Sequence, residues 1–369
     1  MPLRPAISYS PCLRLGLLAA CLLGLSACQG GGAYFPIGLF NTGNPKDLRS
    51  IKKAGFNAVQ TYSRDPAQLK ALAKAADKAG VKLLAHPQEL SASTVPVRGW
   101  PMAAWYLVDE PDVNGMSPSE LCYLAGKVKA WAPRIPGAFV VGAGAKARDY
   151  AACGDILMVD WYPVPHMPLE SAGENVRLTV EAAGDKPVWA VLQAMNWKDY
   201  AQRDPKKPRV GRFPTYGEIR FMTYHSIIAG AKGVWYFSYA KPGGATLAQS
   251  PEEWLAVTAM AKELAALRPI FEGGTPAYLP FPPNPDGPLA KAWRYHGRDY
   301  VIIANPKPKA MQLVPEALLA MHWRPLFETR RYQKELLKKV GEGFYLPPYR
   351  VLVFESRLSW RSSRPKTWP

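Results

Sequence analysis

The sequence predicts an α/β fold, a (β/α)8 TIM barrel followed by a small C-terminal all-β sandwich domain. From residue 35 onward, short apolar runs alternate with segments whose apolar residues recur at three-to-four spacing. After residue 272 the pattern changes to Gly- and Pro-rich turns that separate short β-type runs. The roughly 340 residues after the first 28 exceed what one hydrophobic core usually holds, which indicates one large and one small domain.

Eight apolar runs are the predicted barrel strands. They lie at 35–40, 58–62, 82–85, 104–108, 139–142, 156–161, 188–192 and 234–239. Helical spacing is clearest between them at 44–54, 66–80, 118–132 and 216–231. Gly55, Gly80 and Gly233 stand just before strands, where the end of a helix needs a left-handed residue. Eight strands, each followed by a helix, close as a barrel.

An open doubly wound sheet is the alternative for such an alternating pattern. That fold usually carries a Gly-rich phosphate-binding turn after its first strand. Here the position reads Asn41-Thr42-Gly43-Asn44, without GxGxxG or a Walker lysine. The barrel is therefore favoured for residues 34–272, and no cofactor is expected.

The predicted sandwich domain spans residues 273–357. A helix at 251–267 precedes it, and the glycines and prolines between 273 and 288 mark a linker or long loop. Strand-like runs follow at 290–295, 300–304, 323–327 and 349–354. Residues 358–369 have little apolar content and are expected to form a loose basic tail.

Residues 1–27 have the features of an export signal, with Arg4 and Arg14 and an apolar run at 15–27 that is too short to span a membrane. The tetrapeptide Leu25-Ser26-Ala27-Cys28 resembles a bacterial lipobox. The resemblance implies that Cys28 is lipidated and that 28–33 form a membrane tether. Gln29, where an inner-membrane signal would favour Asp, implies an outer-membrane location facing the periplasm. An ordinary cleaved signal and a soluble secreted protein is the alternative.

The formal net charge of +17 raises nucleic acid, anionic lipid or an acidic polysaccharide as partners. The cations are spread along the chain, and no basic stripe interleaved with aromatic residues is present. A solvated surface explains such a distribution, and an exported protein meets little nucleic acid. We therefore expect no nucleic-acid partner, and the oligomeric state stays open.

Two of the five cysteines, Cys122 and Cys153, remain in the mature chain besides Cys28. Both fall on helices of consecutive barrel units. An oxidising compartment would permit a disulfide between them if their Cα atoms approach within about 7 Å, and two buried thiols are the alternative. Neither has a neighbouring His or Cys at metal-ligand spacing, so no metal site is expected.

Barrel enzymes carry their active site at the carboxyl ends of the strands, where this chain is rich in polar and aromatic residues. Such a mixture suits a sugar, because its ring faces stack on aromatic side chains while its hydroxyls need hydrogen-bond partners. The candidates for stacking are Trp105, Trp161, Trp197 and Trp235. The expected substrate-binding residues are Gln60, Tyr62, His86, Trp161, Tyr162, Gln193, Trp235 and Tyr239, and the carboxylates at strand ends are Asp109, Glu110 and Asp160.

The sequence WYLVDEPD at 105–112 resembles the fourth strand of the barrel glycoside hydrolases often called clan A. The likeness continues in order through DWYP at 160–163, KPVW at 186–189 and GAKGVWY at 230–236. It implies that Glu110 is the general acid/base and that Asp109 is a helper that contacts the sugar. It also implies a Glu nucleophile at the end of strand seven, where this chain has Gln193.

Three interpretations follow from the missing nucleophile. Asp160 orients a water in an inverting or variant hydrolase, or Gln193 binds sugar in a barrel that does not cleave glycans. In the third, the N-acetyl group of the substrate attacks, and two acids such as Asp109 and Glu110 assist it. Blander roles are a helix first-turn acid for Glu110 and a turn cap for Asp160.

Other enzyme classes lack their motifs, because no strand ends in a Gly-x-Ser-x-Gly elbow and no His-Glu-x-x-His is present. A purely structural envelope lipoprotein would not explain the acidic and aromatic strand ends. The sequence therefore predicts a glycoside hydrolase-like lipoprotein acting on a cell-envelope or extracellular polysaccharide. A glycan-binding barrel without catalysis is the alternative.

Overall fold

A computed structural model describes residues 34–203, 210–279, 286–313, 323–330 and 344–356. The chain divides into two compact units, Met1–Tyr34 and Phe35–Pro369, and the fold below is that of the second unit. The predicted signal at 1–27, the lipidated Cys28 with its tether at 28–33, and the basic tail at 358–369 all lie outside the described residues.

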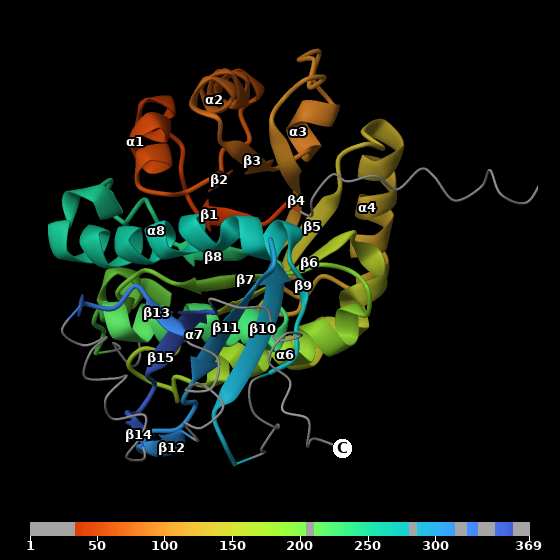
Figure 1. The fold of residues 1–369 in the computed structure, drawn as a ribbon. Helices are drawn as coiled ribbons and strands as arrows, with labels where there is room; N and C mark the ends of the chain where they lie inside the picture. Colours follow the sequence, from red (N-terminus) through yellow and green to blue (C-terminus); the bar gives the residue numbers. More distant parts are fainter. Residues whose placement is uncertain (1–33, 204–209, 280–285, 314–322, 331–343, 357–369) are drawn as a thin grey trace, which may run out of the picture. The chain divides into compact units, whose positions relative to one another are not determined.

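Strands β1 to β8 form a closed parallel barrel in which each strand pairs with the next and β8 pairs with β1. The predicted (β/α)8 barrel is thus confirmed, and Figure 1 shows the helices outside the strands. The barrel strands are β1 (Ile37–Leu39), β2 (Ala58–Thr61), β3 (Lys82–Ala85), β4 (Met102–Asp109), β5 (Gly137–Val141), β6 (Ile156–Trp161), β7 (Val188–Gln193) and β8 (Val234–Phe237).

The helices follow the strands as predicted, with short 3-10 turns in several connections. The α-helices are α1 (Leu48–Lys53), α2 (Pro66–Ala79), α3 (Gln88–Ser91), α4 (Pro118–Trp131), α5 (Ala147–Tyr150), α6 (Ser171–Ala183), α7 (Tyr216–Ala229) and α8 (Pro251–Gly273). The 3-10 helices are η1 (Pro45–Asp47), η2 (Gly144–Lys146), η3 (Ala151–Cys153), η4 (Trp197–Arg203) and η5 (Leu247–Gln249).

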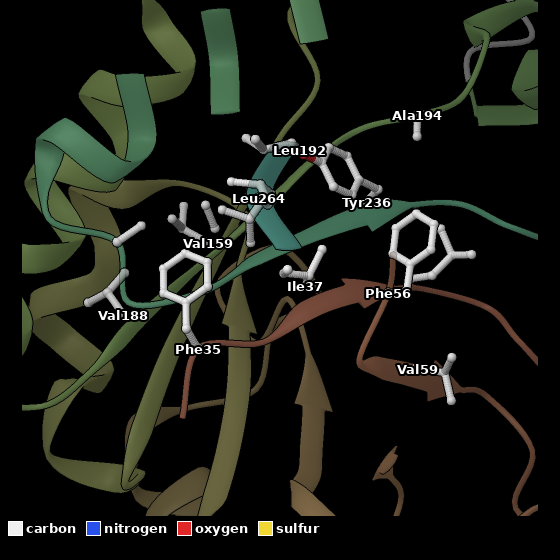
Figure 2. Close-up of a cluster of buried hydrophobic side chains, with 14 of the residues drawn as sticks. Phe35, Ile37, Phe56, Val59, Val159, Val188, Leu192, Ala194, Tyr236 and Leu264 are labelled. Atoms are coloured by element: carbon white, nitrogen blue, oxygen red, sulfur yellow. The ribbon is translucent and has the colours of Figure 1, made fainter. Parts of the chain in front are cut away.

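Strand side chains alternate between the helix layer and the barrel interior, as the two-residue period of a strand requires. Figure 2 shows part of the outer cluster, including Ile37, Leu192 and Tyr236 of the strands and Leu264 of α8. Inside the barrel, the Trp235 ring lies so close to Gly38 that a Cβ there would be 2.0 Å from it. The centre of the barrel is therefore packed, and any site must lie at its end.

Three glycines were expected to have the positive φ angle of the left-handed conformation, and two of them do. Gly55 has φ +109° and Gly80 has φ +65°. The expectation for Gly233 was wrong, because α7 ends instead at Gly230, whose φ is +118°. Gly233 is needed for space, since a Cβ there would lie 2.4 Å from Pro36 Cγ.

The C-terminal part contains a five-stranded antiparallel sheet and a two-stranded ribbon. The sheet has the order β13-β15-β11-β10-β9, and the ribbon pairs β12 with β14. Their bounds are β9 (Thr275–Pro276), β10 (Leu289–Tyr295), β11 (Arg298–Ala304), β12 (Met311–Leu313), β13 (Arg324–Leu326), β14 (Phe344–Leu346) and β15 (Val351–Glu355).

A sandwich of two sheets is not confirmed, because one face of the large sheet packs on the barrel. Ile302 of β11 and Val353 of β15 belong to the same buried cluster as the barrel helices. On the other face, Ile303 and Leu352 pack with Trp323. Both faces of these strands are apolar, so each face needs a cover.

Two cross-links fix parts of the unit to one another. A disulfide joins Cys122 of α4 to Cys153 of η3. Arg220 of α7 pairs with Glu263 of α8 at 3.0 Å, with both side chains 7% exposed. The Arg220 guanidinium also donates to the Val351 carbonyl of β15 at 2.6 Å. Within the described ranges, no helix combines the length and the apolar character needed to cross a membrane.

Candidate active site

A pocket opens at the carboxyl ends of the barrel strands, where the sequence placed the site. Its empty volume is about 420 Å³, with the open mouth included. Carboxylates and aromatic side chains dominate its wall. The lining residues are Phe40, Tyr62, Asp109, Glu110, Val140, Asp160, Tyr162, Val191, Met195, Trp197, Tyr200 and Phe237.

Glu110 follows β4 in a conformation that few non-glycine residues adopt, with φ +43°. Its N–H donates to Val140 O at 3.0 Å, and its carbonyl accepts the N–H groups of Val113 and Asn114. Space for the side chain comes from Gly142, because a Cβ there would lie 3.4 Å from Glu110 Oε1 and 2.6 Å from Val113 Cγ2. Neighbouring backbone therefore holds this acid at the pocket wall in a conformation typical of functional sites.

Asp109 is held by two phenol groups inside the barrel. The Tyr106 hydroxyl donates to Asp109 Oδ1 at 2.5 Å, and the Tyr62 hydroxyl donates to Oδ2 at 3.4 Å. Burial, and then the charge of Asp109, raises the pKa of Tyr62, so this phenol stays a neutral donor. Asp109 thus lines the pocket with its carboxyl group in a fixed orientation.

Asp160, at the end of β6, forms a carboxyl pair with Glu110. The Asp160 residue is 7% exposed, and the Glu110 carboxyl and the Tyr162 hydroxyl are close enough to its carboxyl to hydrogen-bond with it. Burial, followed by the charges of Glu110 and Asp109, raises the pKa of Asp160 well above its usual range. Two carboxyl groups in such contact share one proton, because both cannot ionise at small cost. The pair can therefore keep a proton beside the pocket above the pH at which an ordinary carboxyl group loses it.

Gln193, at the end of β7, is used to hold loops together. Its side-chain oxygen accepts the N–H of Val164 at 2.8 Å, and its Nε2 donates to Val164 O at 2.8 Å and to Met195 O at 3.2 Å. The residue is fully buried. It does not line the pocket, and its amide is bonded to the backbone rather than directed at a ligand.

Tyr62 and Tyr162 line the pocket as expected, but Gln60 and Trp235 do not. Gln60 and Trp235 point into the barrel one layer deeper, and both are fully buried. Two residues along a strand are about 6.6 Å apart, so both side chains lie below the lining of the pocket. Their role is to support the residues above them, as where Trp235 packs edge-on against Phe40 at 5.6 Å.

Three other expected sugar contacts, His86, Trp161 and Tyr239, also lie away from the pocket. His86 is buried against the Tyr106 ring at 5.0 Å, and burial lowers its pKa to about 4. Trp161 points out of the barrel, where its Nε1 donates to Ser171 Oγ at 2.8 Å. Tyr239 packs on the outer Trp254 ring. None of the three is placed to touch a sugar.

Trp197 lines the pocket as expected, whereas Trp105 packs on the Trp131 ring at 5.2 Å and does not line it. Several other lining residues were not among the expected contacts. Trp197 and Tyr200 come from η4, after β7, and are fixed by hydrogen bonds to Tyr162 O at 3.1 Å and Ser238 Oγ at 2.9 Å. Phe237 of β8 stacks on Tyr162 with ring centroids 5.4 Å apart. The sequence signal for Tyr200 was its place three residues after Trp197, in the loop that follows β7 at the active-site end. The remaining four are Phe40, Val140, Val191 and Met195.

The site offers acid–base groups and aromatic walls. Across the described ranges, no group of three or more His, Cys, Asp or Glu side chains has the arrangement to hold a metal ion. Asp109, Glu110 and Asp160 can donate, accept or steady protons, while rings such as Tyr162 and Trp197 can contact the face of a sugar.

Comparisons with known proteins place the fold. No protein-family model and no curated protein matches the sequence. Among solved structures, the chain is similar to a protein titled glycoside hydrolase, with a TM-score of 0.56, 14% identity and coverage of 89% of this chain and 93% of that one.

It is also similar to an α-amylase from Anoxybacillus, with a TM-score of 0.51, 14% identity and coverage of 89% and 96% of the two chains. Amy13B from Eubacterium rectale gives a TM-score of 0.51 at 10% identity and covers 85% and 91%. At such identities the likeness shows that the chain shares a barrel fold with these proteins.

Proposed function

We propose that the protein is a glycoside hydrolase that cleaves O-glycosidic bonds of a cell-envelope or extracellular polysaccharide, with Glu110 as general acid/base. The observation that carries this proposal is the Glu110–Asp160 carboxyl pair in an aromatic pocket at the active-site end of a barrel. Hydrolysis of a glycosidic bond begins with protonation of the leaving oxygen. A carboxyl pair that keeps one proton above the usual titration range of an acid is suited to that step.

Glu110 is the member of the pair that meets the substrate, because it is only partly buried whereas Asp160 is 7% exposed. When the glycosidic oxygen lies against Glu110, the shared proton passes to that oxygen as the bond to the sugar breaks. The pair is left with an additional negative charge, which stabilises the positive charge that develops on the sugar ring. In the hydrolytic step, water returns the proton to the pair.

The pair does not fit the two usual glycosidase geometries with Asp160 as the second carboxylate. Those geometries separate the carboxyl groups by about 5 to 5.5 Å for retention or about 6.5 to 9.5 Å for inversion. Hydrogen-bonded carboxyl groups are closer than either. We therefore propose Asp160 as a partner that shares the proton with Glu110 rather than as a nucleophile or water-activating base.

We also propose that the protein is exported and anchored by a lipid on Cys28 to the outer membrane, facing the periplasm. The apolar run and lipobox-like Leu25-Ser26-Ala27-Cys28 support this location. The disulfide between Cys122 and Cys153 supports it independently, because disulfides persist in oxidising compartments.

The test of the hydrolase proposal is Glu110→Gln, measured against a panel of chitin, peptidoglycan, xylan, cellulose and α-glucan. The native chain is expected to release oligosaccharides from at least one of them. The variant should lose about 10²- to 10⁴-fold in turnover, because it cannot donate a proton, and should keep its affinity. Product release is followed by chromatography and affinity by calorimetry.

Glu181→Gln, an exposed residue of α6, is the matched control and should match the native chain. Full activity of Glu110→Gln would overturn the assignment of the acid. If the native chain binds a glycan of the panel without releasing product at any pH, the non-catalytic glycan-binding barrel is the correct function.

A further inference from the structure

The pocket supplies an acid but offers no nucleophile at the strand end opposite it. On β7, Val191 lines the pocket, and the Gln193 amide is spent on Val164 and Met195. The carboxyl groups that line the described pocket, Asp109, Glu110 and Asp160, come from β4 and β6. Two of them are hydrogen-bonded to each other. The atom that attacks the sugar must therefore come from the substrate or from water.

Asp109 is built as a fixed acceptor. Its carboxylate is oriented by Tyr106 at 2.5 Å and Tyr62 at 3.4 Å, and it lines the same pocket as Glu110. A carboxylate only accepts hydrogen bonds, so a substrate group that binds Asp109 must be a donor. An amide N–H or a sugar hydroxyl meets that requirement.

The apolar part of the pocket wall distinguishes between an amide N–H and a hydroxyl as the donor to Asp109. Val140 of β5, Val191 of β7 and Met195 line the pocket beside the carboxyl groups. Val191 is the direct cross-strand partner of Asp160 in the β6–β7 ladder. A hydroxyl that donates to Asp109 also needs a donor for its own oxygen, and these apolar side chains offer none. They suit a methyl group instead. An acetamido group carries both the N–H for a carboxylate and the methyl for an apolar wall.

We propose that the substrate is a 2-acetamido sugar whose own acetamido oxygen is the nucleophile, with Asp109 holding the amide N–H. This inference rests on the proposed hydrolase function. In the first step, the acetamido oxygen forms a bond to C1 while the bond from C1 to the glycosidic oxygen breaks. The leaving oxygen takes the proton shared by Glu110 and Asp160, and the sugar becomes a cationic oxazoline ring.

In the second step, water attacks C1, the bond from C1 to the acetamido oxygen breaks, and the amide is restored. The proton of the water returns to Glu110, so the pair again holds one proton. Asp109 keeps the N–H oriented and stabilises the positive charge that the ring carries between the steps. C1 is attacked twice from opposite faces, so the released sugar keeps its anomeric configuration.

The test uses the full chain and three hexasaccharides that share a β-1,4-linked glucose backbone and differ only at C2. These are the N-acetylated, the de-N-acetylated and the 2-hydroxyl forms. We expect cleavage of the N-acetylated form with retained configuration, seen by NMR, and at least about 100-fold slower cleavage of the other two, because they lack the internal nucleophile. Asp109→Asn should lower turnover of the N-acetylated form by about 10²- to 10³-fold.

Fluorinated substrates test whether the acetamido group that Asp109 holds takes part in the reaction or only helps to bind the sugar. Replacing acetyl hydrogens with one, two and three fluorines weakens the carbonyl oxygen as a nucleophile. Turnover by the native chain should fall progressively along the series. Asp149→Asn, an exposed residue of α5, is the control and should behave as the native chain does.

Two failures can be told apart. Equal cleavage of the 2-hydroxyl form, an inverted product or no effect of fluorine overturns the acetamido inference and leaves the hydrolase proposal standing. Cleavage of another polysaccharide of the panel, with none of the N-acetylated form, does the same. If no polysaccharide is cleaved, both proposals fail.

Discussion

Asp160 is a buried carboxyl whose placement opposes folding at neutral pH. It lies beside Glu110 and Asp109, and burial raises its pKa above the value of about 3.9 expected in the unfolded chain. Between these two pKa values the folded state keeps a proton that the unfolded state has lost. The free energy of unfolding therefore falls as the pH rises through this window. The carboxyl group proposed to hold the catalytic proton therefore lowers the stability of the folded protein.

Asp160→Asn should consequently raise the stability of the protein while lowering turnover. The amide does not titrate and can still donate to Glu110, so the gain should be small near pH 4 and clearly larger at pH 7. Urea unfolding at both pH values measures it, with Asp149→Asn as the exposed control. A variant less stable than the native chain at pH 7 would contradict the assignment of a costly carboxyl.

At the residue scale, the strand-end pattern found the acids but not the depth of each side chain. Asp109, Glu110 and Asp160 were predicted and do line the pocket. Trp235 points inward like Phe237, yet it lies two residues earlier on β8 and is buried below the pocket. The alternation of a strand identifies the inner face, but depth depends on how the eight strands are staggered. A single sequence does not reveal that stagger.

At the scale of elements, helix α7 joins the barrel to the C-terminal sheet through Arg220. Its guanidinium pairs with Glu263 of α8 and donates to Val351 O of β15. The Tyr224 hydroxyl donates to the same Glu263 carboxylate at 2.8 Å. A buried charge with several partners of this kind becomes very costly when one partner is removed.

Arg220→Met should therefore lower the free energy of unfolding by about 3 to 5 kcal/mol, because Glu263 stays buried without its cation. Adding Glu263→Gln should recover part of the loss. Arg177→Met on the exposed face of α6 is the control and should change stability by less than about 0.5 kcal/mol. Urea unfolding followed by tryptophan fluorescence gives all three values. A loss below about 1 kcal/mol in Arg220→Met would show that the network contributes little to stability.

The barrel strands were predictable because apolar runs long enough to be buried on both faces stand out from helical spacing. All eight predicted runs overlap β1 to β8. The two-residue β9 and the three-residue strands β12 and β14 were missed, since so short a stretch carries no periodicity. The sandwich was expected from the strands alone. Nothing in them shows that one face of β11 and β15 packs on barrel helices.

At the scale of the whole molecule, the proposed anchoring to the outer membrane depends on one atom, the sulfur of Cys28. Cells that make the protein should incorporate a labelled fatty acid into the native chain and none into Cys28→Ala, because that cysteine is the proposed acceptor. Label on the purified chain is read on a gel. A label retained by the variant, or absent from the native chain, would show that the anchor assignment is wrong.

The three hydrogen bonds of Gln193 also restrict which side chain can stand at the end of β7. Its amide accepts from Val164 N and donates to Val164 O and Met195 O. A glutamate at 193 accepts only, so two carbonyl oxygens would face a negative charge in a buried place. Gln193→Glu would therefore loosen the loops that the amide joins. A carboxylate at the end of β7 is incompatible with the loop conformation seen here.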